Sequence, residues 1–278
     1  MEIQEAGAPV SSERFGLKGP RGTVFEKITF SAAAGTLIAI TGPSGSGRTC
    51  LLLALTGRMK ANQGHARIDG HPLPKRLAAV RRISALGPVP GINDLDPALT
   101  VTEQLRERVL LQRRFSSSVR TLLRPRRERA AASRARLEAA LKAAGLDLDT
   151  LPRGGRTSVR DLGRLEALRL SIALAMLGEP RLLAVDDLDL KLSEAERAEA
   201  WAMVRSLAEA GTTVLAVCSE PPPEAGEESG ESGAAPLVLV RTDTGRNTGT
   251  DTGRDTPPDA GDDEKGEAAD ALAEASRA

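Results

Sequence analysis

The sequence predicts an α/β domain built on a mainly parallel β-sheet. Short apolar strands alternate with amphipathic helices along much of the chain, the order that produces parallel sheets covered by helices. A glycine-rich loop at residues 42–49 joins one strand to a helix, and a second strand ends in Asp186 and Asp187. Because the carboxyl ends of parallel strands meet at one edge, we expect the loop and the carboxylates to lie there together.

The first predicted elements lead into and out of the glycine-rich loop. Residues 24–30 alternate between apolar and polar, as a strand with one buried face does, and residues 37–40 form the apolar strand before the loop. Turn residues within 57–70 predict an edge hairpin. Residues 78–89 then give a weak helix-then-strand pattern before a long loop rich in proline and glycine.

Helical patterns fill the middle of the chain, at about residues 92–178. Thr100 and Glu103 have the spacing of a capping box, which predicts a helix beginning there. Two further helices are expected at residues 127–144 and 161–177. This block interrupts the alternation of strands and helices, so we expect it to form a helical subdomain.

The strand–helix alternation resumes after this block. A buried strand leads into the carboxylates at residues 182–187, and Ser193 is the predicted N-cap of the next helix. Two more strands are expected at residues 212–218 and 237–240.

The glycine-rich loop follows the pattern G-x-x-x-x-G-K-[ST], with Arg48 in place of lysine. Its glycines let successive backbone N–H groups converge on a phosphate, and the following helix adds unpaired N–H groups and a positive dipole end. Arg48 keeps the positive charge in a planar fork. A purely structural turn is the alternative to phosphate binding. The expected nucleotide-binding residues are Gly42, Pro43, Ser44, Gly45, Ser46, Gly47, Arg48, Thr49 and Cys50, and the Thr49 hydroxyl is expected to meet Mg²⁺.

Charge and composition divide the chain into a domain and a tail. Formal net charge is +0, but residues 221–278 carry 14 acidic and 5 basic side chains. We therefore expect a flexible N-terminus at 1–15, a nucleotide-binding domain at 16–241, and an acidic disordered tail at 242–278. Residues 1–15 lack a secretory signal's apolar core, and no apolar run reaches the ~18 residues of a membrane span.

Arginines are concentrated in residues 106–136, which contain 11 arginines and 2 glutamates. This pattern is typical of a solvated helical face, and the alternative is a surface for acidic headgroups or an acidic partner loop. Aromatic residues make up 2% of the chain, which leaves few stacking platforms for single-stranded nucleic acid. The composition therefore argues against nucleic acid as a partner.

Taken together, these motifs resemble an ATP-binding cassette (ABC) transporter nucleotide-binding domain over about residues 16–240. Residues 42–49 resemble the Walker A loop and residues 182–187 the Walker B strand. The helix that precedes Walker B in the family resembles residues 172–180. The segment that follows the family's Q-loop resembles residues 99–103. The resemblance implies a P-loop NTPase fold with a mainly parallel core sheet, antiparallel edge strands and a helical subdomain.

The resemblance also implies roles for the two carboxylates. Asp186 matches the Walker B aspartate, which holds Mg²⁺ through water. Asp187 falls where the family has its catalytic glutamate, and it is one methylene shorter.

Other family positions differ in this chain. The signature motif Leu-Ser-Gly-Gly-Gln aligns with residues 162–166, where Gly163 brings no hydroxyl. The Q-loop glutamine aligns with Gly91, and the switch histidine aligns with Ser219. The base-stacking aromatic aligns near Gly19, with Phe15 and Phe25 as the nearest rings.

Two functional hypotheses follow from this pattern. The first is the ATP-binding subunit of an ABC transporter, with slow or partner-dependent hydrolysis. Such a subunit binds Mg²⁺ and ATP, pairs with a second cassette in a homo- or heterodimer, and docks on transmembrane subunits at the cytoplasmic face of the cell membrane. The alternative is a non-catalytic nucleotide sensor that regulates a membrane partner. A nucleic-acid-associated cassette ATPase is a third, less favoured class. Whether the chain is an enzyme stays open between these readings.

Overall fold

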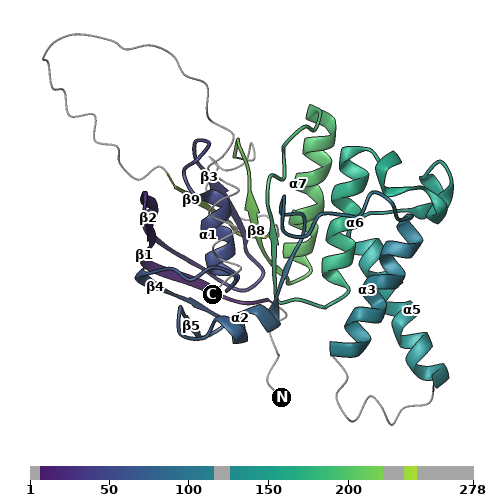
Figure 1. Cartoon of the computed structure of the whole chain (residues 1–278), viewed down its shortest axis with the longest axis horizontal. Coiled ribbons are helices and arrows are strands. Elements are labelled where there is room, and N and C mark those ends of the chain that lie inside the picture. The colour runs from purple at the N-terminus through teal and green to yellow at the C-terminus, as the bar shows by residue number, and fades with distance from the viewer. Residues whose placement is uncertain (1–6, 116–125, 222–234, 243–278) are drawn as a thin grey trace, which may run out of the picture. The chain divides into compact units, whose positions relative to one another are not determined.

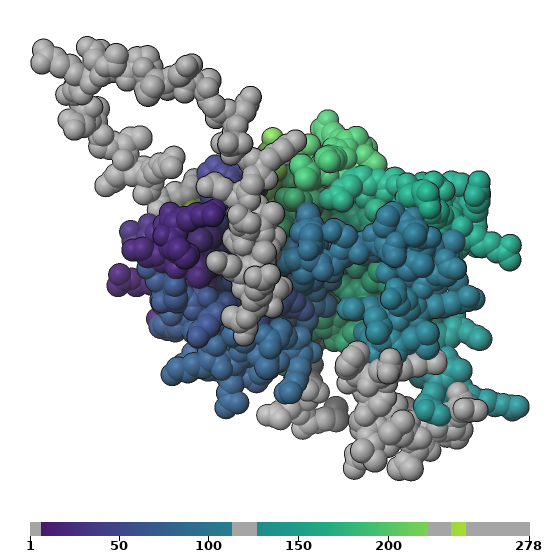
Figure 2. All heavy atoms as spheres, in the orientation of Figure 1, coloured from purple at the N-terminus to yellow at the C-terminus, as the bar shows by residue number. Residues whose placement is uncertain are grey.

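Two β-sheets with helices between and beside them make up the described part of the chain (Figure 1). The computed structural model describes residues 7–115, 126–221 and 235–242, all within the compact unit Met1–Thr244. Residues 245–278 lie outside the described residues. Figure 2 shows the heavy atoms in the same orientation, with the first strands in purple and the helices from Val101 onward in teal and green.

The larger sheet is parallel throughout and has five strands. Its order is β6-β7-β8-β3-β9, with bounds Ser84–Leu86, Leu182–Val185, Thr213–Val217, Leu37–Thr41 and Leu237–Arg241 respectively. The predicted mainly parallel sheet is confirmed. Its inner strands β3, β7 and β8 are buried at every position, because helices or the second sheet cover both faces, and such strands read as continuous apolar runs.

The smaller sheet is antiparallel, in the order β2-β1-β4-β5. Its strands are β1 (Val10–Gly19), β2 (Gly22–Ala32), β4 (Gln63–Ile68) and β5 (His71–Leu73). The predicted strand at 24–30 is the centre of β2. The hairpin expected within 57–70 is formed by β4 and β5, and its second strand lies just beyond that range.

The strand β1 corrects the expectation of a flexible N-terminus at 1–15. Val10 is buried, and β1 pairs with β2 on one side and β4 on the other. The pairing with β2 shifts register between Ser12 and Phe15 and again at Leu17. These irregularities break the period of two that a strand otherwise shows in sequence, so the strand has no clear sequence pattern. Residues 1–6 lie outside the described residues.

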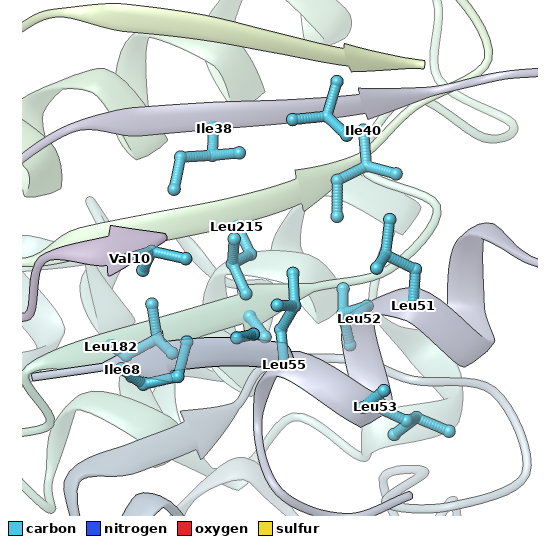
Figure 3. Packing of buried hydrophobic residues seen from close by; sticks show 14 of the residues in the cluster. Val10, Ile38, Ile40, Leu51, Leu52, Leu53, Leu55, Ile68, Leu182 and Leu215 are labelled. Atoms are coloured by element: carbon cyan, nitrogen blue, oxygen red, sulfur yellow. The ribbon is translucent and has the colours of Figure 1, made fainter. Parts of the chain in front are cut away.

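Helix α1 (Arg48–Leu55) lies between the two sheets and joins them into one core. Its leucines pack against Ile38 and Ile40 of β3, Leu215 of β8 and Ile68 of β4 (Figure 3). Fully burying a leucine side chain contributes about 1.5–3 kcal/mol, so this run fixes the helix firmly behind the glycine-rich loop. A short helix, α2 (Leu77–Ile83), then leads into β6.

The opposite face of the parallel sheet is covered by α6 (Arg164–Met176) and α7 (Glu194–Glu209). Ser193 caps α7 as predicted, accepting a hydrogen bond from the Glu196 amide while Glu196 accepts one from the Ser193 amide. Helix α6 begins at Arg164 rather than near residue 161, because Gly163 has an extended backbone and the three residues before Leu162 form a short 3₁₀ turn.

The middle of the chain contributes helices α3 (Val101–Phe115) and α5 (Arg126–Ala143), together with short 3₁₀ turns at Leu148–Thr150, Gly154–Arg156 and Val159–Asp161. They share a separate small core with α6. The capping box is confirmed: the Thr100 amide donates to Glu103 Oε2, and the Glu103 amide donates to Thr100 Oγ1. The arginine-rich stretch is described only in part, since residues 116–125 lie outside the described residues.

Thr242 corrects the expected start of the tail at residue 242. Its side chain is buried, and its amide donates to the Thr41 carbonyl. Residues 243–278, for which a disordered tail is expected, lie outside the described residues. Within the described ranges, no helix combines the length and apolar character needed to cross a membrane.

Candidate nucleotide site

The carboxyl ends of the parallel strands bring together segments that are far apart in sequence. The glycine-rich loop follows β3, Asp186 and Asp187 follow β7, and Cys218 and Ser219 follow β8. Thr242 follows β9 at the same edge, because β9 runs parallel to β3. The expected meeting of loop and carboxylates at one edge is therefore observed.

The loop takes a backbone that glycine permits and other residues do not. Gly42 and Gly47 have φ angles of 154° and 80°. A Cβ atom on Gly47 would overlap the Val24 carbonyl, so no larger residue fits there without movement. Gly47 caps α1 without a side-chain hydrogen bond, and the first turn of α1 has no acidic residue. The N-terminus of α1 therefore keeps its positive character for an anion.

Thr49 and Asp186 are joined by a direct hydrogen bond. Thr49 Oγ1 donates to Asp186 Oδ2 over 2.8 Å, although 137 residues separate them in sequence. Asp186 is 2% exposed. Burial raises the pKa of Asp186 above its ordinary value, while the Thr49 hydrogen bond opposes that rise and the charge of Asp187 adds to it. A hydroxyl and a carboxylate side by side are oxygen ligands of the kind that suit Mg²⁺.

Asp187 has a left-handed backbone, with φ of 47°. Its amide donates to Asp186 Oδ1 over 3.1 Å, so the turn directly after β7 holds the Asp186 carboxylate in place. Aspartate adopts this conformation several times more readily than most residues other than glycine. The backbone at this position therefore favours the shorter acid that the sequence carries.

Arg48 reaches across the edge toward β8. Its Nη1 donates to the Cys218 carbonyl over 2.8 Å. The guanidinium is also close enough to Asp186 to oppose the rise in that carboxyl's pKa. Arg48 therefore carries its positive charge between the loop, the end of β8 and the buried carboxylate.

A third carboxylate, Asp189, holds the segment after β8. Its oxygens accept hydrogen bonds from the Ser219 amide at 2.9 and 3.1 Å and from the Glu220 amide at 3.1 Å. Sequence reasoning missed this residue; the acidic run at 186–189 was its only signal. Burial, then the charge of Asp189, raises the pKa of Cys218 to about 12.

The segment aligned with the signature motif forms the start of α6. Glu166 Oε2 accepts the Gly163 amide hydrogen over 2.8 Å, and Arg164 Nε donates to the Leu190 carbonyl. A carboxylate already bound at this helix N-terminus repels an incoming anion. Glu166 therefore occupies the Gly163 amide and places a negative charge at this end of α6.

The remaining positions that differ from the family pattern are also visible. Gly91 is exposed, and its amide donates to Asp94 Oδ2. Phe15 and Phe25 are both buried and pack together, with ring centroids 5.9 Å apart and ring planes tilted by 47°. Their rings belong to the core between the sheets, so neither offers a face to a nucleotide base.

Comparison with known proteins gives one consistent result. A family model described as "ABC transporter" matches residues 25–188, more than half of the chain. Nod factor export ATP-binding protein I from Paraburkholderia xenovorans is 31% identical over 193 residues, covering 69% of this chain and 57% of that protein. A daunorubicin resistance ATP-binding protein from Streptomyces coeruleorubidus is 32% identical over 185 residues, covering 66% and 51% respectively. The chain thus spans between about half and three fifths of the length of these curated relatives.

Solved structures support the same fold. A dimeric bacterial ABC transporter cassette has a TM-score of 0.61 and 19% sequence identity, covering 84% of this chain and 94% of that one. A cassette in a post-hydrolysis state, bound to ADP and Pi, has a TM-score of 0.58 and 22% identity, covering 76% and 88%. The P-loop NTPase architecture expected from the sequence is confirmed by these neighbours. With the family model matching most of the folded region, the chain belongs to the ABC transporter ATP-binding family.

Proposed function

We propose that this chain is the ATP-binding subunit of an ABC transporter and binds Mg²⁺ and ATP at the loop of residues 42–49. The observation that carries this proposal is the Thr49–Asp186 hydrogen bond. It joins the hydroxyl and the carboxylate that a P-loop protein uses around one metal ion, directly beside a loop in which Gly42 and Gly47 have no room for a Cβ atom.

In this proposal each residue of the site has a separate role. The loop amides and the N-terminus of α1 hold the phosphates, and Arg48 contributes a positive charge. Thr49 and Asp186 are the residues that would hold the metal. When bound, Mg²⁺ supplies positive charge that offsets the charge of the phosphate oxygens. Asp187 is the residue proposed to orient or deprotonate an attacking water.

We propose that hydrolysis is slow unless a partner cassette supplies intact groups. Glu166 occupies an amide at the start of α6, Gly163 brings no hydroxyl, and Ser219 stands where the family has histidine. Losing one donor that stabilises a transition state costs about 10²–10³ in rate. The same features support the second candidate, a nucleotide sensor that binds ATP without turnover and regulates a membrane partner.

The proposed partners are transmembrane subunits on separate chains and a second cassette, identical or different. The proposed location is the cytoplasmic face of the cell membrane. The curated relatives are named as export or resistance ATP-binding proteins, which supports an export system as the setting. Asp187, and the positions aligned with the signature and switch, would act within that assembled dimer.

The proposal is tested by titrating the purified chain with ATP, with and without Mg²⁺, in a calorimeter, and by measuring phosphate release in parallel. Binding that requires Mg²⁺, with release at least 10²-fold slower than in an intact cassette, is the expected result. Thr49→Val should lower the Mg²⁺-dependent part of the affinity, and Thr150→Val, in the helical region, serves as the control. Binding with no phosphate release in the presence of the partner cassette favours the sensor, and no binding refutes both.

A further inference from the structure

Thr242, the residue directly after β9, contacts both the end of β3 and Ser46 within the glycine-rich loop of residues 42–49. Strands β3 and β9 are parallel and pair Thr41 with Arg241, so the next residue on each side is Gly42 and Thr242. Thr242 therefore enters the site from the far end of the folded chain, about 200 residues away in sequence.

Thr242 makes three hydrogen bonds at this point. Its amide donates to the Thr41 carbonyl over 2.9 Å, and its hydroxyl donates to the same carbonyl over 3.2 Å. Its Oγ1 also lies 2.6 Å from Ser46 Oγ. A hydroxyl has one hydrogen, so the two hydroxyl bonds form together only if Ser46 donates to Thr242 and Thr242 donates to Thr41.

The interior of the loop is thereby tied to the end of β3. Thr41 lies directly before the loop and Ser46 lies within it, and the Thr242 side chain bridges them. Gly42 has room for no Cβ atom, because that atom would overlap Thr242 Oγ1 and approach Ser46 Oγ within 2.7 Å. Thr242 is 7% exposed, so water competes little for these bonds.

We propose that Thr242 is a positioning residue for nucleotide binding, which sets the shape of the phosphate loop through Ser46. It does not touch the nucleotide itself. While Ser46 donates to Thr242, its O–H is not available to a ligand, and the loop presents its backbone amides in a fixed arrangement. This inference rests on the proposed nucleotide binding for its effect on affinity, but not for its effect on the loop.

The test compares Thr242→Val, which keeps the shape and loses the hydroxyl, with Thr242→Ser, which keeps the hydroxyl. Thr242→Val should weaken Mg-ATP and Mg-ADP binding by about five- to tenfold, the size of one lost hydrogen bond. Amide hydrogen exchange at residues 44–47, measured without nucleotide, should become several-fold faster. Thr242→Ser should restore both values.

Two further variants complete the design. Thr150→Val is the control, because it removes a hydroxyl that donates to the nearby Asp147 carbonyl in the helical region. It should change neither the exchange rates nor the affinity. Ser46→Ala should reproduce the exchange result, and adding Thr242→Val to it should have a smaller further effect than in the wild type.

The outcomes separate this inference from the proposed function. The inference would be overturned if Thr242→Val had the same amide exchange rates and the same nucleotide affinity as the wild type. It would also be overturned if Thr242→Ser changed both quantities as much as Thr242→Val does. If the wild type binds no nucleotide, the proposed function fails, while faster loop exchange in Thr242→Val still supports the role of Thr242 in holding the loop.

Discussion

At the scale of single residues, Asp186 couples the site to pH. Burial raises its pKa in the folded chain above the ordinary value of 3.8. Its contribution to stability is therefore complete below the unfolded pKa and is lost as pH rises through the folded pKa. The cost of burying the charged carboxylate is then present at neutral pH, where Mg²⁺ would relieve it.

Asp186→Asn should remove that pH-dependent loss. We expect the free energy of unfolding of the variant, relative to wild type, to increase as pH rises above 3.8 in buffer containing a chelator. Urea unfolding at a series of pH values measures this difference. The slope with pH matters rather than the offset, because asparagine has one acceptor oxygen and can keep only one of the hydrogen bonds from Thr49 and the Asp187 amide. Parallel curves for the two proteins would contradict the prediction.

The thiol of Cys50 reports on the same carboxylate. Burial raises the pKa of Cys50, and the charge of Asp186 raises it further. We expect Asp186→Asn to speed alkylation of Cys50 in the folded chain, because more thiolate is present at a given pH. Peptide mass spectrometry after timed iodoacetamide treatment measures the rate.

Cys218 is the internal control for that experiment. Its pKa of about 12 reflects burial and the neighbouring Asp189, so its alkylation should stay slow in both proteins. Equal acceleration at both thiols would indicate loosening of the fold instead of a local charge effect.

At the scale of elements, Arg58 connects the end of α1 to β6. Its guanidinium donates to the Thr56 carbonyl, to Ser84 Oγ and to the Ser84 carbonyl, at 2.8 to 3.1 Å. Burial, with the charges of Arg81 and Arg108, lowers the pKa of Arg58 to about 10, so the group stays charged at neutral pH. These bonds tie the helix behind the glycine-rich loop to the edge of the parallel sheet.

Arg58→Met should destabilise the fold by about 2–4 kcal/mol, because it removes the donor to Ser84 Oγ and to the Ser84 carbonyl and leaves the Thr56 carbonyl with the Ser84 hydroxyl alone. Chemical denaturation measures the loss. Arg82→Met, on an exposed arginine at the end of α2, is the matched control and should stay within about 0.5 kcal/mol of wild type. Equal effects of the two variants would show that the hydrogen bonds of Arg58 contribute little.

At the scale of the whole molecule, β9 is the edge strand of the parallel sheet and pairs with β3, the strand that leads into the glycine-rich loop. A chain ending after residue 242 keeps this strand, and one ending after residue 236 loses it. We expect the first to melt within a few degrees of the full chain. The second should melt at least about 10 °C lower or precipitate, because β3 becomes an exposed apolar edge. Equal melting temperatures for the two truncated chains would refute this.

Much of this architecture could be predicted from sequence because its signals are local. The glycine-rich loop, the run into Asp186 and the caps at Thr100 and Ser193 are each read within a few residues. What sequence could not provide are contacts between distant segments. The partner of Arg48 lies 170 residues away and that of Ser46 lies 196 residues away. Strand β1 was missed for a different reason, since its bulges remove the alternation by which strands are found.

The position of β3 in the sheet has a consequence for how the chain is made. Both of its neighbours, β8 and β9, are encoded far downstream, with β8 about 170 residues later. At translation rates of about 5–20 residues per second, the nascent strand waits roughly 10–35 seconds at the ribosome before either neighbour emerges. A growing polypeptide therefore carries an unpaired, apolar β3 through most of the synthesis of this sheet, and the edge that holds the glycine-rich loop is complete only when β9 leaves the exit tunnel.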